Sequence, residues 1–132
     1  MSLSESRTLT VSIARDADAV HQFVSHPENL PRWATVFCQS VRKVNLDWVM
    51  QTPAGEMKVR FVPANAFRVA DHFVSPTPGV EIYIPLRVLP NGAGCEVVFT
   101  LFRQVNMLAA DFVRDLELVR NDLQSLKRVL EA

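Results

Sequence analysis

The chain begins with a regular alternation of apolar and polar residues. Over Arg7–Ile13, RTLTVSI, apolar side chains occupy every second position, which is the period of a half-buried β-strand. The apolar residues that follow are spaced by three and four positions and predict a short helix, capped by Asp16 or Asp18 and ended before Pro27. The segment PENLPRW adds at most one further helical turn, which places Trp33 at the end of this helical pair.

From Val36 to Arg103 the pattern changes to short runs rich in Val, Ile and Phe. Turn signals interrupt these runs about every ten residues. The signals are Val44–Leu46, PAG (Pro53–Gly55), PAN (Pro63–Asn65), SPTPG (Ser75–Gly79) and PNGAG (Pro90–Gly94). This spacing predicts a meander of roughly six antiparallel strands, and therefore about seven strands in all.

The last quarter of the chain has a helical period. Apolar residues recur every three or four positions and form one stripe, while charged residues fill the other sides. The stripe consists of Leu108, Phe112, Leu116, Val119, Leu123, Leu126 and Leu130. The charged sides hold Asp111, Arg114, Glu117, Arg120, Asp122 and Lys127. One long amphipathic helix is predicted, buried against the face of the antiparallel sheet, and the fold class is therefore α+β.

The composition is that of an ordinary globular domain. A chain of 132 residues falls within the usual size of one domain, so residues 1–132 are expected to form a single domain. The formal net charge is zero. Because the Lys and Arg residues are scattered and matched by acids, nucleic acid is not expected as a partner.

Several other classes of protein are not expected either. The N-terminal MSLSESRTLTV has no apolar segment behind a basic start, which argues against a secretory signal, and no run is long enough to insert in a membrane. Cys38 and Cys95 lie outside any CxxC spacing, so neither a disulfide framework nor a zinc site is predicted. The sequence also has no glycine-rich phosphate loop and no Ser-His-Asp spacing. We expect no metal, no cofactor and a cytoplasmic location.

The order of elements, with PENLPRW after the first strand and DLQSLKRVLE at the end, resembles the SRPBCC or START-like superfamily. This helix-grip superfamily includes Bet v 1-type allergens, lipid-transfer domains and polyketide cyclases. The segments FCQSV, ADHFV, PLRVLPNGAGCEVVFTLFR and DLQSLKRVLE look like a bacterial, polyketide cyclase-like branch of it. The resemblance implies an antiparallel curved sheet of seven strands wrapped around the C-terminal helix, with two short helices between strands one and two. It also implies a cavity between sheet and helix, but it is weak evidence for any reaction.

The turns sort the residues of the later strands onto two faces. A turn at SPTPG that pairs Val74 with Val80 places His72 opposite Ile82, and a turn at PNGAG extends this register to Arg103. The more apolar set, expected to face inward, contains His72, Val74, Ile82, Ile84, Leu86, Val88, Val97, Phe99, Leu101 and Arg103. The outward set contains Asp71, Phe73, Glu81, Tyr83, Arg87, Glu96, Val98, Thr100 and Phe102.

His72 and Arg103 are the polar members of the inward set and the candidates for catalysis. Both are expected opposite Ile82 from its two neighbouring strands, about 10 Å apart, where they could bind a carboxylate, phenolate or enolate together. The alternatives are an Arg103 that reaches water at the strand end and a His72 with a structural hydrogen bond. Asp71 points to the opposite face from His72, so the two cannot form a His–carboxylate dyad.

The residues expected to bind a ligand are Trp33, His72, Ile82, Ile84, Leu86, Phe99, Leu101, Arg103, Phe112 and Leu116. For Trp33, Phe112 and Leu116 the alternative is a role in the core. The hairpin between Leu46 and Pro63 has two candidate inner faces, and its spacing does not choose between them.

Two other groups are interpreted as structural. Asp71, Tyr83 and Arg87 are expected to form a solvated cross-strand cluster that contributes little stability. Cys38 is expected to be a buried filler rather than a nucleophile, because no neighbour in the sequence would lower its pKa.

Three functions follow from this pattern and resemblance. The leading hypothesis is a module that binds a small hydrophobic or aromatic molecule between sheet and helix without reaction. The second is an enzyme similar to polyketide aromatases and cyclases, with His72 as general base and Arg103 as enolate stabiliser. The third is an interaction protein, such as a homodimer, with a filled cavity.

Overall fold

Residues 2–132 are described by the computed structural model and form eight strands, three α-helices and one short 3-10 helix. In chain order these are β1 (Ser6–Ile13), α1 (Ala17–Val24), η1 (Pro27–Asn29), α2 (Leu30–Trp33), β2 (Ser40–Val44), β3 (Asp47–Thr52), β4 (Gly55–Phe61), β5 (His72–Ser75), β6 (Ile82–Ile84), β7 (Leu86–Asn91), β8 (Gly94–Phe102) and α3 (Ala109–Glu131). The α+β class, the short helices after the first strand and the long C-terminal helix are confirmed.

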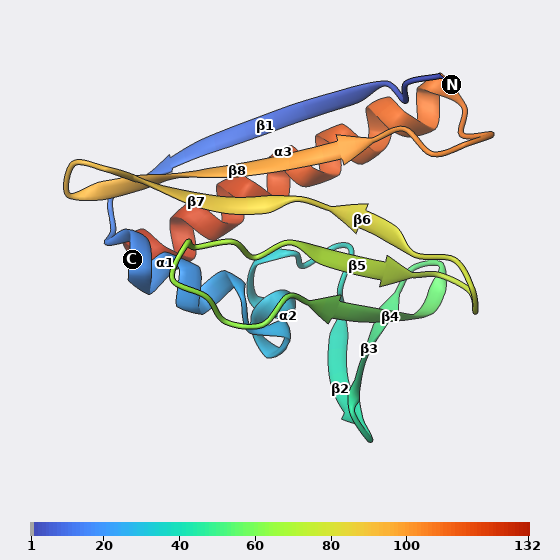
Figure 1. Cartoon of the computed structure of the whole chain (residues 1–132), viewed down its shortest axis with the longest axis horizontal. Coiled ribbons are helices and arrows are strands. Elements are labelled where there is room, and N and C mark those ends of the chain that lie inside the picture. The colour runs from blue at the N-terminus through green and yellow to red at the C-terminus, as the bar shows by residue number, and fades with distance from the viewer. Residues whose placement is uncertain (1) are drawn as a thin grey trace.

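The strands form two antiparallel sheets, ordered β1-β8-β7 and β2-β3-β4-β5-β6. The segment before β5 runs beside β7 and joins them: Val69 bridges Arg87, and the amide of Ala70 donates to the carbonyl of Leu86 at 2.8 Å. Figure 1 shows the sheets as one curved surface, with α3 lying along β1 and β8. The curved surface and the helix therefore enclose the interior between them.

The structure has one strand more than the seven predicted, because the run after SPTPG is divided in two. Pro85 separates β6 from β7, and proline has no N–H to donate to a strand ladder. Its carbonyl still accepts a hydrogen bond from the amide of Thr100 at 3.1 Å, so the chain stays beside β8. Proline thus breaks the ladder where the two sheets diverge.

The predicted register between β5 and β6 was wrong by two residues. His72 lies opposite Ile84 and not Ile82, which pairs with Val74. The amide of Val80 bonds the carbonyl of Thr77 at 3.2 Å within the turn, so Val80 cannot pair with Val74 as predicted. A shift of two residues keeps every side chain on its predicted face, because side chains alternate along a strand.

Local signals at the first strand and first helix are confirmed. The buried positions of β1 include Val11 and Ile13, in the predicted alternation. Asp16 caps α1, since its carboxylate accepts a hydrogen bond from the amide of Ala19 at 3.1 Å. Gly94 opens β8 against the end of β1, where a Cβ atom would stand 2.5 Å from the carbonyl oxygen of Ile13, so only glycine fits.

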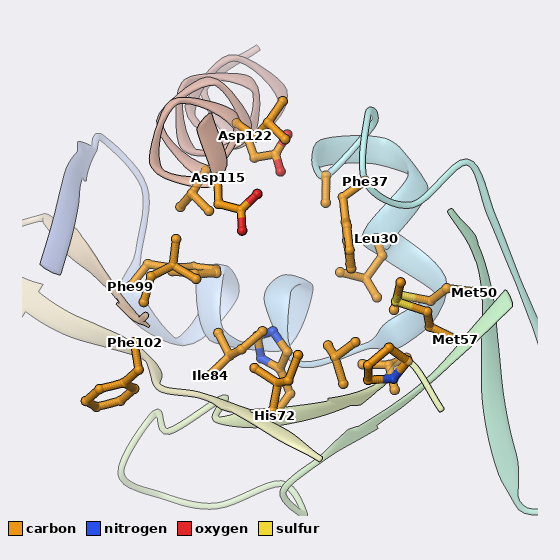
Figure 2. A pocket seen from close by; sticks show the side chains of 18 of the residues that line it. Leu30, Phe37, Met50, Met57, His72, Ile84, Phe99, Phe102, Asp115 and Asp122 are labelled. Carbon is orange, nitrogen blue, oxygen red and sulfur yellow. The ribbon is translucent and has the colours of Figure 1, made fainter. Parts of the chain in front are cut away.

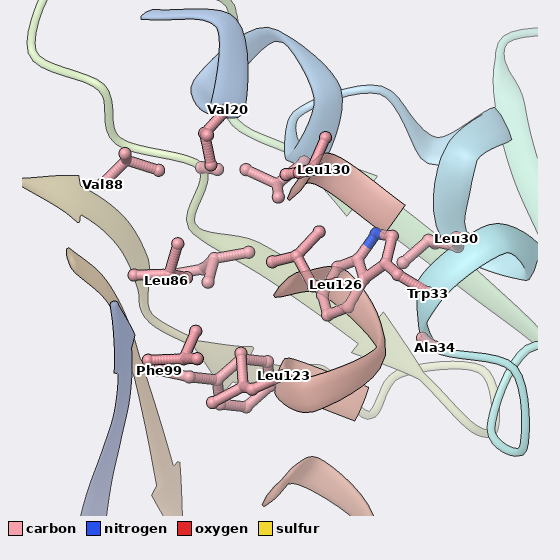
Figure 3. Packing of buried hydrophobic residues seen from close by; sticks show 14 of the residues in the cluster. Val20, Leu30, Trp33, Ala34, Leu86, Val88, Phe99, Leu123, Leu126 and Leu130 are labelled. Atoms are coloured by element: carbon pink, nitrogen blue, oxygen red, sulfur yellow. The ribbon is translucent and has the colours of Figure 1, made fainter. Parts of the chain in front are cut away.

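The core lies between the C-terminal half of α3, the short helices and the three-stranded sheet. Figure 3 shows Leu123, Leu126 and Leu130 of α3 packed toward Trp33 and Leu86. These residues are almost fully buried, as predicted for the apolar stripe. They fix α3 against the sheet at its C-terminal end.

The N-terminal half of α3 differs from the predicted stripe. Leu108 is 67% exposed because the helix begins only at Ala109 and Leu108 is its N-cap. Asp122, which the helical period placed on a charged side, is only 8% exposed. The inward face of α3 is therefore rotated toward Asp122 relative to the predicted stripe.

Replacing Leu126 tests how much the helix stabilises the fold. Leu126→Ala should lower the free energy of unfolding by about 2–5 kcal/mol, because it leaves a cavity in a fully packed region. The measurement is urea unfolding followed by circular dichroism. Val113→Ala on the same helix is the control, since Val113 is 57% exposed and should change stability by less than about 0.5 kcal/mol. Equal effects of the two substitutions would contradict this packing.

Candidate functional site

A cavity of about 330 Å³ lies between the five-stranded sheet, the end of β8, α2 and the middle of α3. Figure 2 shows side chains from these elements pointing into a common space. The lining residues are Leu30, Trp33, Ala34, Phe37, Met50, Met57, Val59, His72, Val74, Pro76, Ile82, Ile84, Phe99, Leu101, Phe102, Gln104, Met107, Asp115, Leu118, Val119 and Asp122. All but four of them are apolar, and the exceptions are His72, Gln104, Asp115 and Asp122.

The hairpin that the sequence left open has a defined inner face. β3 pairs with β4 so that Met50 lies opposite Met57 and Trp48 opposite Val59. Met50, Met57 and Val59 line the cavity, whereas Val49 lies opposite Lys58 on the other face. Two flexible methionine side chains therefore form one wall, and such side chains adapt to ligands of different shape.

His72 is at the sheet side of the cavity and is only 5% exposed. Its ring stacks on Phe61 with centroids 4.4 Å apart and meets Phe99 edge to face at 6.2 Å. Nδ1 lies 3.1 Å from the carbonyl oxygen of Ala70. Because a carbonyl only accepts hydrogen bonds, Nδ1 carries the proton in this contact. Among residues 2–132, no group hydrogen-bonds Nε2, which is left as an acceptor.

Burial also fixes the charge of His72. Loss of solvation lowers its pKa to about 4, despite the opposing effects of the Ala70 carbonyl and the Asp71 carboxylate. The imidazole is therefore neutral at pH 7. A neutral imidazole protonated on Nδ1 offers the cavity one hydrogen-bond acceptor and no charge.

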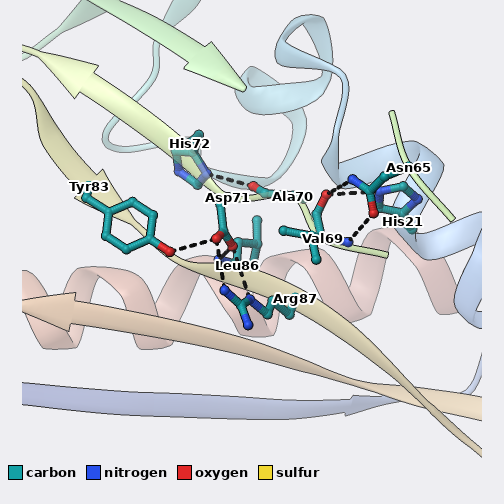
Figure 4. A network of polar contacts seen from close by, with 9 residues as sticks. All are labelled: His21, Asn65, Val69, Ala70, Asp71, His72, Tyr83, Leu86 and Arg87. Carbon is teal, nitrogen blue, oxygen red and sulfur yellow. Dashed lines mark hydrogen bonds and ion pairs between the residues drawn. The ribbon is translucent and has the colours of Figure 1, made fainter. Parts of the chain in front are cut away.

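Asp71 points away from the cavity, as predicted, and makes no hydrogen bond to His72. Its carboxylate accepts hydrogen bonds from the hydroxyl of Tyr83 at 2.7 Å, the amide of Leu86 at 2.9 Å and the guanidinium of Arg87 at 3.1 Å (Figure 4). These bonds outweigh the effect of burial and lower the pKa of Asp71. The predicted cluster of Asp71, Tyr83 and Arg87 is present, and Tyr83 and Arg87 are exposed, but Asp71 itself is buried and not solvated as expected.

The segment before Asp71 is held by two side chains from elsewhere. The carbonyl of Val69 lies 2.8 Å from the amide nitrogen of Asn65, which donates to it, and 3.3 Å from Nε2 of His21 on α1 (Figure 4). Asn65 also accepts the amide of Val69 at 3.1 Å through its side-chain oxygen. These bonds fix the backbone that leads into β5 and thereby the direction of His72.

Two carboxyl groups enter the cavity from the opposite side. Asp115 and Asp122 project from α3 toward the space above His72 (Figure 2). Burial raises the pKa of Asp115, and it raises the pKa of Asp122 to about 7. Within residues 2–132, neither carboxyl has a hydrogen-bond or ion-pair partner. Two unpaired acids, about two helical turns apart on α3, therefore face an apolar space.

The sequence analysis missed these two acids. They are seven residues apart, with Leu118 and Val119 between them, and this heptad spacing places all four side chains on one face of α3. The spacing shows that the four residues share a face, but it does not show that this face is the inward one. The two acids were missed because an acid beside an apolar stripe usually faces solvent.

The structure brings together part of the predicted ligand-binding set. Trp33, His72, Ile82, Ile84, Phe99 and Leu101 line the cavity. Leu86 and Phe112 are buried outside the lining and Leu116 is partly buried outside it. Trp33 is also part of the core, so both of its expected roles are present.

Arg103 does not enter the cavity, so its predicted convergence with His72 was wrong. Its guanidinium donates to the carbonyl of Met107 at 2.9 Å and to the carboxylate of Glu5 at 3.3 Å. β8 ends at Phe102, so the alternation of faces no longer controls the side chain of Arg103. The next loop and the N-terminal segment offer it partners near solvent.

Cys38 fits the structural interpretation. It is fully buried, its thiol donates to the carbonyl of Ser40 at 3.4 Å, and burial raises its pKa to about 11. The thiol therefore stays protonated at neutral pH and is not an activated nucleophile. In the described part of the chain, no three His, Cys, Asp or Glu side chains are grouped to hold a metal ion. No helix within residues 2–132 is long and apolar enough to cross a membrane.

The Asp71 network predicts a large loss of stability on truncation. Asp71→Ala should lower the free energy of unfolding by about 1–3 kcal/mol, because it leaves the Leu86 amide and the Tyr83 hydroxyl without a partner. The control is Glu81→Ala, which removes an exposed ion pair with Arg60 and should cost less than about 1 kcal/mol.

The same substitution has a pH signature in denaturant unfolding. The folded pKa of Asp71 is lowered, so its contribution is present above the unfolded pKa of about 4 and is lost as pH falls further. The difference between wild type and Asp71→Ala should therefore shrink below about pH 4. A difference that stays constant down to pH 2 would show that the carboxylate charge is not what stabilises the fold.

Asp122 predicts the opposite pH dependence. Its folded pKa is raised, so the folded protein binds a proton that the unfolded chain releases, and stability falls as pH rises from about 4 to about 7. Asp122→Asn should remove this loss and be more stable than wild type above pH 7, by up to about 4 kcal/mol. Near pH 4 the two proteins should be equal. Urea unfolding at several pH values measures this, with Glu117→Gln on the exposed face as control, and parallel profiles would refute it.

The comparisons with known proteins show the fold. No family model matches the chain, and no curated protein matches it. Solved structures match over nearly the whole chain. The protein XoxI from Bacillus cereus is 16% identical, with a TM-score of 0.76 over 95% of this chain and 94% of that one. The Zhui aromatase/cyclase from Streptomyces sp. R1128 is 15% identical, with a TM-score of 0.73 over 96% and 93%.

A third likeness extends this fold beyond the aromatase/cyclases. Ara h 8.0201 is 10% identical, with a TM-score of 0.67 over 96% of this chain and 97% of that one. At these identities the shared feature is the three-dimensional arrangement of a curved antiparallel sheet, two short helices and a long C-terminal helix. The chain thus has a helix-grip fold in common with Ara h 8.0201 and the Zhui aromatase/cyclase.

Proposed function

We propose that the protein binds a small apolar or aromatic molecule in the cavity between α3 and the five-stranded sheet. One observation carries the proposal: the cavity of about 330 Å³ has 21 lining residues, of which four have His, Gln or Asp side chains. Pockets for small molecules have volumes of roughly 300–1,000 Å³, mostly apolar walls and a few polar groups. The cavity therefore fits a ligand of the size of two or three fused or linked rings.

The position of the cavity supports this function. It is formed by packed elements of the fold and not by a surface loop alone, and Trp33 and Phe99 belong to the core as well as to its walls. The walls are therefore preorganised, which lowers the cost of binding. The similarity in fold to the Zhui aromatase/cyclase is consistent with a site for an aromatic molecule.

The geometry favours binding over the enzymatic alternative. That alternative required a cation to stabilise an enolate, and Arg103 is bonded to Met107 and Glu5 instead. Within residues 2–132, no Lys or Arg lines the cavity. His72 is present, but its lowered pKa makes it a weak base in the empty site. We therefore assign no reaction.

The cavity also bears on the third hypothesis. An interaction protein with a filled core would have no such space, so the cavity of about 330 Å³ argues against that hypothesis. A homodimer remains compatible with ligand binding and is not needed for it.

Blocking the cavity should abolish binding without unfolding the protein. Val119 lines the cavity from α3, so Val119→Trp should fill part of it and weaken binding of the uncharged fluorescent probe N-phenyl-1-naphthylamine at least tenfold. Fluorescence titration measures the affinity. Val113→Trp introduces the same ring on the exposed side of the helix and should bind like wild type.

Two outcomes would contradict the proposal. One is a wild-type protein that does not bind the probe. The other is a folded Val119→Trp variant, by circular dichroism, that binds it as tightly as wild type.

A further inference from the structure

The polar groups of the cavity share one property: none of them brings a positive charge. His72, Asp115, Asp122 and Gln104 are the four, and in the described part of the chain no lysine or arginine lines the space. His72 is neutral and presents only the lone pair of Nε2. The two acids accept hydrogen bonds when ionised. The cavity therefore has an excess of acceptors and of potential negative charge.

The acidic residues on the two faces of α3 differ in whether they have ion-pair partners. On the exposed face, Asp111 pairs with Arg114 and Glu117 pairs with Arg120, each three residues later. On the inward face, the residues three positions after the acids are Leu118, which is apolar, and Ser125, which donates no bond to Asp122. Within residues 2–132, the helix thus gives each outward acid of these pairs an ion-pair partner and gives the inward acids none.

Asp122 is the more deeply buried of the two inward acids. Its residue is more than nine-tenths buried, its carboxyl points into the cavity, and no group of residues 2–132 donates to it (Figure 2). Buried polar groups in folded proteins nearly always have a hydrogen-bond partner. A carboxyl without one, directed into an empty space, indicates a partner that comes from outside the chain.

We propose that the ligand of this cavity is an aromatic molecule that carries a protonated amino group, and that Asp122, assisted by Asp115, binds this group. The inference rests on the proposed function and names the ligand class for the same site. The aromatic part would occupy the space among the sheet residues and Phe99, and the amine would lie against α3.

A cation explains the pair of acids better than a neutral hydroxyl group does. A hydroxyl donates one hydrogen bond but carries no charge, so an ionised carboxylate in an apolar space stays uncompensated. An ammonium group donates up to three hydrogen bonds, and its single positive charge compensates one ionised carboxylate. An anionic ligand would add a charge of the same sign with no cation to pair it. The expected preference is therefore amine over alcohol, and alcohol over carboxylate.

Three probes with the same ring system separate these possibilities: 2-naphthylmethylamine, 2-naphthylmethanol and 2-naphthoate. Isothermal titration calorimetry at pH 7.5 should give at least tenfold tighter binding of the amine than of the alcohol, and no measurable binding of 2-naphthoate. Asp122→Asn should weaken the amine at least tenfold and leave the alcohol within about twofold. Glu117→Gln, which removes a carboxylate from the outward face, should change neither.

The outcomes distinguish this inference from the function on which it rests. Alcohol or 2-naphthoate binding as tightly as the amine would overturn the ligand class and leave the binding function standing. An Asp122→Asn variant with unchanged amine affinity would do the same, as would N-phenyl-1-naphthylamine binding with no binding of the amine. If neither that probe nor any naphthyl compound bound the wild type, both proposals would fail. The comparison among probes on the wild type does not depend on the folding of any variant.

Discussion

The buried carboxylate of Asp71 holds the junction between the two sheets, and the rest of the site depends on it. The amide of Ala70 donates a hydrogen bond to the carbonyl of Leu86. In a regular antiparallel ladder the amide of Leu86 would donate in return to the carbonyl of Ala70. Here the Ala70 carbonyl accepts a hydrogen bond from Nδ1–H of His72, and the Asp71 carboxylate accepts the hydrogen bond of the Leu86 amide in its place. The exchange satisfies every group, and it occurs beside Pro85, where the ladder is already interrupted. Asp71 and His72 point to opposite faces and are nevertheless linked through the backbone groups of Ala70 and Leu86.

This coupling sets the chemistry of the cavity. Because Nδ1–H of His72 is hydrogen-bonded to the Ala70 carbonyl, Nε2 is the acceptor that remains for the interior, and burial keeps the ring neutral. The opposite wall has carboxyl groups without cations, although the outer face of the same helix pairs its acids with arginines. A pocket of this kind selects ligands that donate hydrogen bonds, since a ligand without donors leaves its buried acceptors unsatisfied. For the proposed ligand, the shape of the cavity would limit its size and the acceptors would limit its chemistry.

Much of the fold could be predicted from local patterns, whereas the site depended on contacts between distant segments. The alternation in β1, the Asp16 cap and the three-and-four spacing of Leu123, Leu126 and Leu130 are local signals, and each was correct. The inward direction of His72 was correct even though its register was shifted, because a shift of two residues preserves the face. Arg103 was misplaced because its strand ends one residue earlier and its partners lie in the loop after it and at the N-terminus. The burial of Asp71 and Asp122 depends on what packs around them, which the hydrophobic period of their own segments does not specify.

The unpaired carboxyl of Asp122 is an unfavourable feature of the fold, and the proposed ligand gives a reason for it. A buried carboxyl that has no partner lowers the stability of the empty protein at neutral pH, and an asparagine or an apolar residue would remove that loss. Under the proposed function a bound molecule supplies the missing donor, and part of its binding free energy offsets this loss of stability. Within residues 2–132, the acids Asp111 and Glu117 on the outward face of α3 have arginine partners, whereas the inward Asp115 and Asp122 have none. In this proposal the cavity trades stability for ligand selectivity, and the packing of the C-terminal leucines of α3 lets the fold tolerate the unpaired acid.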